Sequence, residues 1–164
     1  MSVFMLFKEK SLIKKLISSK KIIIKGSDYT VKQHIVWYQH KAGYSYDKWV
    51  LIDGRGNDDY RLFINVKESV IGFARIFFHE FKEPMPKELR YKDNNYILTC
   101  DEFCTAIKVE GDEVYKKDSA EIWWDYISKT NKNEGLSLGR NWETWEREDL
   151  KTNFLSIEDI QIIG

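Results

Sequence analysis

Two runs of β-forming residues joined by a glycine-containing turn constrain the fold of this chain most strongly. They span Tyr46 to Val66, with the sequence YDKWVLIDGRGNDDYRLFINV. Aromatic and β-branched residues favour strands, and the Gly and Asn residues of the turn tolerate positive φ. The segment therefore predicts a β-hairpin. A looser copy, with an aromatic run, a polar turn and alternating leucines, extends from Trp123 to Trp142.

The same signals predict further strands along the chain. The run IIIK, a Gly-Ser-Asp turn and the run YTVKQHIVWYQ indicate a short strand followed by a long one. Val70 to Phe81 is the most hydrophobic segment and predicts a strand that is buried on both faces. We also expect a strand from Cys104 to Glu110, and a closing strand in IEDIQII that pairs with an early one.

The strands fall into two segments that resemble each other. KDNNYIL at 92–98 repeats the pattern of KGSDYTV at 25–31, and Pro84 and Pro86, the two prolines of the chain, lie between the segments. We therefore expect a mainly β protein with an internal repeat. It would consist of two related antiparallel β halves, residues 22–81 and 88–164, joined by a linker at 82–87 and packed as a barrel-like or sandwich unit.

Residues 1–21 predict a short amphipathic helix that is rich in lysine. Its apolar stripe comprises Met5, Leu6, Leu12, Ile13, Leu16 and Ile17. Two interpretations are open: the stripe packs on the domain or on a partner subunit, or the helix lies on an anionic membrane surface. The residues proposed for membrane or partner contact are Lys8, Leu12, Ile13, Lys14, Lys15 and Leu16.

Charge and composition exclude several classes of protein. The net charge is zero, although seven lysines and one glutamate give residues 1–25 a charge of +6. A nucleic-acid partner is not expected, because such proteins are usually strongly basic. No run is apolar and long enough for a membrane span, no secretory signal is recognisable, and two cysteines are too few for a disulfide framework. We expect a cytoplasmic protein with reduced thiols, peripheral to the membrane under the second interpretation of the helix.

No motif of catalysis, cofactor binding or metal binding stands out. Cys100 and Cys104 lack the second ligand pair of a structural zinc site, and the turn at 53–59 is neither a phosphate loop nor a calcium loop. The carboxylate pairs are expected to be solvated and to titrate normally. They are Asp58-Asp59, Asp101-Glu102 and Glu148-Asp149. We predict no catalytic residue, no cofactor and no metal.

A group of aromatic residues around one acid is the best candidate for a ligand site. Trp123 and Trp124 are adjacent, so in a strand they point to opposite faces, and Asp125 shares the face of Trp123. Exposed tryptophans can form stacking platforms for sugars or single-stranded nucleic acid, although such residues are more often core. We therefore assign Trp123, Trp124 and Asp125 as candidate ligand-binding residues. An enzyme with its acid centred on Asp125 is a further hypothesis.

The order of turns and strands resembles an uncharacterised bacterial family, domain of unknown function 4178. The matching elements cover roughly residues 20–164 and comprise Gly26 to Val31, Trp49 to Leu51, Asp53 to Gly56, Leu62 to Val66, Asp93 to Tyr96, Gly111, Asp125-Tyr126, Leu136-Ser137-Leu138 and Ile160 to Ile163. The chain departs from the family pattern at Phe63, at Asn65-Val66 and at Gly139, where the pattern has Trp or Glu. The resemblance implies a small cytoplasmic bacterial module without established chemistry, associated with membrane-stress proteins of the phage-shock type.

Taken together, these patterns favour a non-enzymatic interaction module that docks to a protein partner or to the cytoplasmic face of the membrane. The alternative is a ligand-binding β domain for a glycan or small molecule that uses exposed aromatic residues. Nothing in the sequence determines the oligomeric state.

Overall fold

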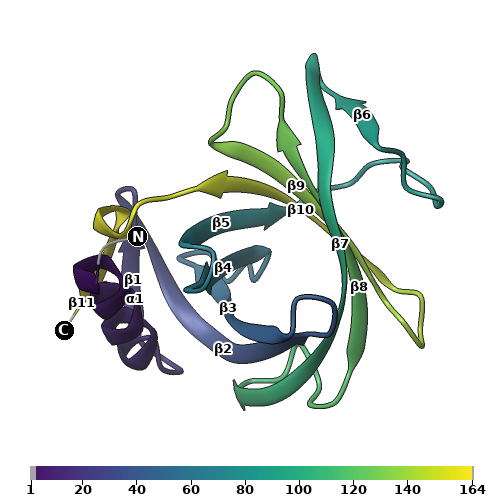
Figure 1. Ribbon diagram of the computed structural model, residues 1–164. Helices are drawn as coiled ribbons and strands as arrows, with labels where there is room; N and C mark the ends of the chain where they lie inside the picture. Colours follow the sequence, from purple (N-terminus) through teal and green to yellow (C-terminus); the bar gives the residue numbers. More distant parts are fainter. Residues whose placement is uncertain (1–2, 164) are drawn as a thin grey trace.

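The chain folds into a closed antiparallel β-barrel with a short helix against one side (Figure 1). The computed structural model describes the backbone of residues 3–163 and the side chains from residue 8 onward. The elements are α1 (Val3–Lys15), β1 (Lys21–Ile24), β2 (Ser27–Gln39), β3 (Tyr44–Asp53), β4 (Tyr60–Asn65), β5 (Val70–Ile76), β6 (Glu88–Tyr91), β7 (Asn94–Gly111), β8 (Ala120–Ser128), β9 (Glu134–Asn141), β10 (Arg147–Phe154), a 3-10 turn (Ile157–Asp159) and β11 (Ile160–Ile163).

Eight strands close the barrel in the order β2-β3-β4-β5-β10-β9-β8-β7, and β7 pairs back onto β2. The barrel thus consists of two four-stranded meanders, β2–β5 and β7–β10, which share one interior. A short strand precedes each meander and pairs with its first strand: β1 with β2, and β6 with β7. The expected mainly β, barrel-like architecture is confirmed. The internal repeat remains a prediction.

The hairpins predicted from turn residues are present. The first is β3–β4, whose turn contains Gly56 at φ 86°, and the second is β8–β9. Asp53 stabilises the first turn, because its Oδ1 accepts hydrogen bonds at 2.9 Å from the backbone N–H groups of Arg55 and Asn57. The closing strand β11 pairs with β1, as expected.

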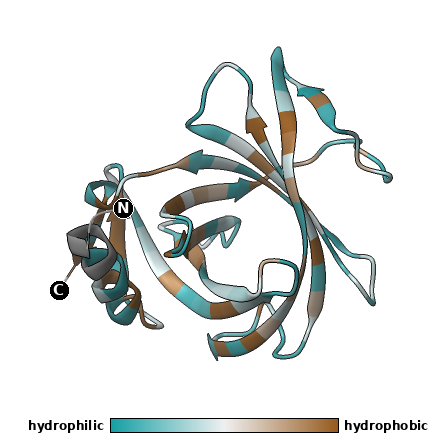
Figure 2. Cartoon of the chain, viewed as in Figure 1, coloured by the Kyte–Doolittle hydropathy of each residue, from teal (hydrophilic) through white to brown (hydrophobic). Residues whose placement is uncertain are grey.

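Side chains alternate between the barrel interior and its outer surface along each strand. Figure 2 shows hydrophobic residues on the barrel strands and on the strand beneath α1. On β3, Lys48 and Val50 point inward, whereas Trp49 and Leu51 point outward into an apolar cluster beneath α1. A second outer cluster, on β8 and β9, lies beneath β6 and the segment before it. The barrel therefore has apolar layers on two outer sides in addition to its interior.

Helix α1 packs its apolar side on the barrel. Leu12 and Leu16 are buried in the cluster that contains Trp49, and the Trp49 indole N–H donates to the Leu16 carbonyl oxygen at 2.9 Å. The helix ends at Lys15, not at residue 21, and the chain turns at 18–19 before it enters β1. The side chains of Met5 and Leu6, also assigned to the apolar stripe, lie outside the described residues, as do residues 1, 2 and 164.

The prediction of one continuous strand from Val70 to Phe81 is wrong beyond Ile76. After β5 the chain leaves the barrel, and residues 77–87 cross the outer face of β8 and β9. Phe77 and Phe81 pack on that face, whereas Phe78 is 94% exposed. The hydrophobicity of this segment thus reflects its role as a cover for the second outer cluster.

Strand β10 has no counterpart among the expected strands. Its sequence, REDLKTNF, has few of the β-branched and aromatic residues that signal a strand. It nevertheless joins the two meanders, because it pairs with β5 on one side and with β9 on the other. Its inward positions carry Glu148, Leu150 and Thr152, so polar residues occupy part of the barrel interior.

Candidate ligand-binding cavity

The barrel encloses a cavity of about 410 Å³. This volume falls within the range of about 300–1,000 Å³ that is typical of small-molecule sites. Its walls are mainly apolar, formed by Tyr46, Phe63, Val70, Cys104, Leu150 and Phe154, with Lys48 and Trp123 also in the lining. The exposed residues Lys41, Ala42, Glu68 and Asp101 line the cavity too, so its mouth lies at the end of the barrel where β2 turns into β3.

Two glycines allow large rings to lie flat along the inner wall. Gly139 of β9 faces Trp123 of β8, and Gly72 of β5 faces Phe63 of β4. A Cβ atom at Gly139 would lie 2.4 Å from the Trp123 ring, and one at Gly72 would lie 2.0 Å from the Phe63 ring. The glycines therefore provide the space in which these two aromatic walls are held, an arrangement known for glycines within sheets.

Hydrogen bonds between neighbouring loops and strands stabilise the rim around the mouth of the barrel. The Glu102 carboxylate accepts the backbone N–H of Lys41 at 2.6 Å and that of Ala42 at 3.2 Å, which fixes the β2–β3 loop to β7. Lys41 also forms an exposed ion pair with Asp101 at 2.8 Å. On the other side of the same loop, the Tyr44 hydroxyl donates to Glu68 of the β4–β5 turn at 2.7 Å.

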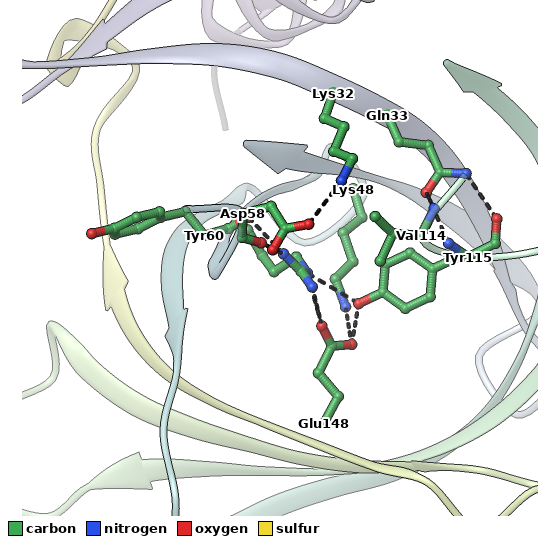
Figure 3. A network of polar contacts seen from close by, with 9 residues as sticks. Lys32, Gln33, Lys48, Asp58, Tyr60, Val114, Tyr115 and Glu148 are labelled. Atoms are coloured by element: carbon green, nitrogen blue, oxygen red, sulfur yellow. Dashed lines mark hydrogen bonds and ion pairs between the residues drawn. The ribbon is translucent and has the colours of Figure 1, made fainter. Parts of the chain in front are cut away.

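The far end of the interior is closed by a charged network (Figure 3). Nε and Nη2 of Arg61 lie 2.8 and 2.7 Å from Oε1 of Glu148, and the Tyr115 hydroxyl donates to the other carboxylate oxygen. The ammonium of Lys48 lies 3.8 Å from that second oxygen and 4.3 Å from the centre of the Trp123 ring. Lys48 is thus the member of the network that reaches the cavity.

Tyr115 enters the barrel from the loop between β7 and β8, and Gln33 holds this loop in place. The Gln33 side chain accepts the backbone N–H groups of Val114 and Tyr115 at 3.1 and 2.9 Å and donates to the Tyr115 carbonyl oxygen at 2.8 Å. Gln33 is fully buried and follows a bulge in β2. Three hydrogen bonds to one buried side-chain amide therefore hold the loop that closes this end of the barrel.

Burial and mutual attraction shift the pKa values of the interior groups. Burial lowers the pKa of Lys48, although Glu148 opposes the shift. Burial acts to raise the pKa of Glu148, but Lys48 and Arg61 outweigh it, so that this pKa lies below its ordinary value. Glu121, on the same inner face as Trp123, has a pKa raised by burial to about 7.

Asp125 and Trp123 both line the cavity, as their shared strand parity predicted. The Ser137 hydroxyl donates to Oδ1 of Asp125, and the Cys100 thiol donates to Oδ2 at 3.4 Å. Loss of solvent raises the Asp125 pKa. Asp125 is therefore a hydrogen-bonded wall residue.

The third candidate, Trp124, lies on the other side of β8. It is buried in the outer cluster beneath residues 77–91, away from the cavity. The two tryptophans point to opposite faces, as predicted, but the hypothesis that one of them is exposed for ligand binding is wrong, because Trp123 lies inside the barrel and a covering segment buries Trp124. The exposed tryptophans are Trp142 and Trp145, near the β9–β10 turn.

Both cysteines are free thiols whose side chains line the cavity. Desolvation and the neighbouring Asp125 raise the pKa of Cys100 to about 12, and burial raises that of Cys104 further. Such thiols are poor nucleophiles at neutral pH, because the thiolate is the reactive form. Among residues 8–163, no three His, Cys, Asp or Glu side chains gather as metal ligands.

The predicted solvation of the carboxylate pairs is wrong for Glu148-Asp149 and for Glu102, which is buried at the barrel rim. The expected normal titration is wrong for Asp58 and Asp101, because hydrogen bonds from Lys32 and Lys41 lower their pKa values. Glu148 points into the network described above, and Asp149 is buried on the outer face, where it lies 2.8 Å from His79 and 2.8 Å from Arg147. Both residues belong to the unrecognised strand β10. Asp58 also has a partner, Lys32, at 2.8 Å.

Sequence reasoning missed Lys48, Arg61, Gln33 and Glu148 as site residues. A signal existed for Lys48 and Arg61: in the first hairpin Lys48 is adjacent to Trp49 and Arg61 is adjacent to Leu62, so each basic residue must lie on the face opposite to its apolar neighbour. That this opposite face is an enclosed interior depends on barrel closure, which strand alternation does not reveal.

The residues proposed for membrane or partner contact divide into two groups. Leu12 and Leu16 are buried against the barrel and Ile13 packs beside them, which matches the first interpretation of the helix. Lys14 and Lys15 are exposed, and Lys8 is half-buried. Any docking through α1 would therefore rely on lysine charge, without insertion of the leucines.

Fold and site together define a single-chain antiparallel β-barrel with a mainly apolar internal cavity and a buried charged network. Comparison of the chain with protein-family models, curated proteins and solved structures found no match. The resemblance to domain of unknown function 4178 therefore stays a prediction. None of the helices described has the length and apolar character needed to cross a bilayer.

Proposed function

We propose that the protein binds a small, mainly apolar molecule inside the barrel. The observation that carries the proposal is the cavity itself: about 410 Å³ of space, lined mostly by apolar side chains and reached through one rim. Sites of this form, with a few polar groups among apolar walls, are typical of small-molecule binding. The proposal keeps the ligand-binding alternative predicted from the sequence, but it places the site in the barrel interior and not at exposed tryptophans.

The wall is suited to holding a ligand in one place. The rings of Phe63 and Trp123 are fixed by close packing against Gly72 and Gly139. The closed end is held by buried hydrogen bonds from Gln33 and by the Arg61–Glu148 pair. A preformed pocket avoids the entropy cost of ordering its own walls when a ligand binds.

The test is titration with the neutral fluorescent dye N-phenylnaphthylamine, whose emission rises in apolar surroundings. We expect saturable binding to the wild-type protein and a loss of binding in Val70→Trp, which fills the cavity from its wall. Ile107→Trp is the matched control, because Ile107 is exposed on the outside of β7. Equal dye binding by the two variants would refute binding inside the barrel.

The exposed lysines of α1 support a second candidate function, docking to a protein partner or an anionic membrane surface. Lys10, Lys14 and Lys15 are solvent-exposed on one short helix. Each lysine near an anionic surface contributes on the order of 1 kcal/mol. Co-sedimentation with vesicles containing phosphatidylserine should fall when all three are changed to Gln. If the triple variant and the wild-type protein are recovered equally in the supernatant, docking to the membrane is refuted. Lys108→Gln, on the barrel wall, is the control variant.

A further inference from the structure

We infer that the ligand is an organic acid whose carboxylate binds at Lys48, with its apolar body directed toward the mouth of the barrel. This inference rests on the proposed function, because it names the chemical class that the cavity accepts. Its evidence is a set of hydrogen-bond donors in the cavity lining that have no acceptor.

Lys48 supplies the charge. Its side chain is almost completely buried, yet within residues 8–163 its ammonium makes no hydrogen bond, and its ion pair with Glu148 is long at 3.8 Å. Glu148 is already engaged by Arg61 and Tyr115. An ammonium has three N–H donors, and burying them without acceptors is costly. An anionic group at this point would satisfy them.

Two further polar atoms in the same lining share this property. The Trp123 indole nitrogen and the Thr152 hydroxyl oxygen are buried and have no hydrogen-bond partner in the described part of the chain. Both residues line the cavity together with Lys48. The indole can only donate and the hydroxyl can donate, so an acceptor from the ligand fits the charge and the polarity of all three.

A ligand amine is the competing class, because carboxylates also line the cavity. These carboxylates, however, already have partners: Asp125 accepts from Ser137 and Cys100, Glu68 from Tyr44, and Glu102 from two backbone N–H groups. Oε2 of Glu121 also has no hydrogen-bond partner among the described residues, but Glu121 is not among the residues that line the cavity. Within the lining, the unpartnered buried atoms are the Trp123 indole nitrogen, which can only donate, and the Thr152 hydroxyl, which can donate, and this favours an acid over an amine.

The position of the apolar residues sets the ligand's orientation. Leu150 and Val50 belong to the interior cluster near Lys48, and Phe63, Val70 and Phe154 line the cavity on the way to the rim. A chain or ring attached to the carboxylate would bury its apolar surface against these side chains, which is favourable at about 25 cal/mol per Å². The acid group of the ligand thus lies deepest in the cavity, at Lys48.

The experiment compares octanoate, octanol and octylamine as competitors of bound N-phenylnaphthylamine at pH 7.5. We expect octanoate to compete at least about tenfold more strongly than either of the others, since charge-assisted hydrogen bonds are among the strongest. In Lys48→Met the advantage of octanoate over octanol should disappear, while Lys108→Met should retain it. The ranking in wild-type protein is informative even if the Lys48 variant folds poorly.

Three outcomes separate the inference from the function on which it rests. Failure of the neutral dye to bind would overturn both. If the dye binds but octanol competes as strongly as octanoate, the preference for an acid is refuted and the proposal of an apolar ligand site stands. Strongest competition by octylamine would assign the site to amines and show that the carboxylates of the lining determine its specificity.

Discussion

Two guanidinium nitrogens of Arg61 contact a single carboxylate oxygen of Glu148, at 2.8 and 2.7 Å, across the interior of the barrel. Arg61 is on β4 and Glu148 on β10, two strands that are not neighbours in the sheet. The pair therefore links the two meanders directly, in addition to their backbone pairing.

Arg61→Met should destabilise the protein strongly. The substitution leaves Glu148 charged and buried without its main partner, which typically costs about 3–5 kcal/mol. Urea unfolding followed by tryptophan fluorescence measures the change. Arg75→Met, on the exposed face of β5, is the control and should cost little. The double variant Arg61→Met with Glu148→Met should recover most of the loss, and a double variant no better than the single one would contradict this account.

Glu121→Gln should make the protein more stable at pH 8 but not at pH 4.5. The folded-state pKa of Glu121 is raised to about 7 from the ordinary 4.5, so the folded state binds this proton more tightly than the unfolded state does. Stability from this group is therefore present at low pH and is lost as pH rises through 7. The shift corresponds to on the order of 3 kcal/mol. Unfolding curves of both proteins across this pH range measure it, and a difference that does not vary with pH would be inconsistent with the shift.

Gly139→Ala should destabilise the barrel by roughly 1–3 kcal/mol, the usual cost of overpacking. The new methyl group would lie 2.4 Å from the Trp123 ring, which would have to move into the cavity. Gly54→Ala is the matched control, because a Cβ at that position meets nothing within 4 Å. Thermal unfolding gives the stability, and binding of N-phenylnaphthylamine should weaken in Gly139→Ala alone. If Gly139→Ala were as stable as Gly54→Ala, the close packing of Gly139 against the Trp123 ring would be refuted.

Leu16→Ala should cost about 2–5 kcal/mol, as buried leucine truncations usually do. Leu16 is fully buried beside Trp49, whereas the neighbouring Ile17 is 54% exposed, so Ile17→Ala should have little effect. Chemical denaturation compares the two variants. If both cost the same, the burial of Leu16 against the barrel, directly after the end of α1, would be incorrect.

Local residue patterns predicted more of the fold than of the site. Period-two alternation and turn residues identified both main hairpins, the pairing of a late strand with an early one, and the shared face of Trp123 and Asp125. They did not identify β10, because the polar residues of REDLKTNF form a strand only when β5 and β9 flank it. They also assigned Phe77 and Phe81 to a strand, although these residues cover an outer face.

The sequence by itself determined the β-rich character, the hairpins and which side chains share a face, because these follow from the geometry of a pleated strand and from the residues that tolerate tight turns. Only the tertiary structure decided that one set of faces encloses a cavity. That outcome requires β7 to pair with β2 and β5 with β10, contacts between residues far apart in the chain. The same closure removes Lys48, Arg61 and Glu148 from water, so that residue types usually found on the surface form a buried charged network.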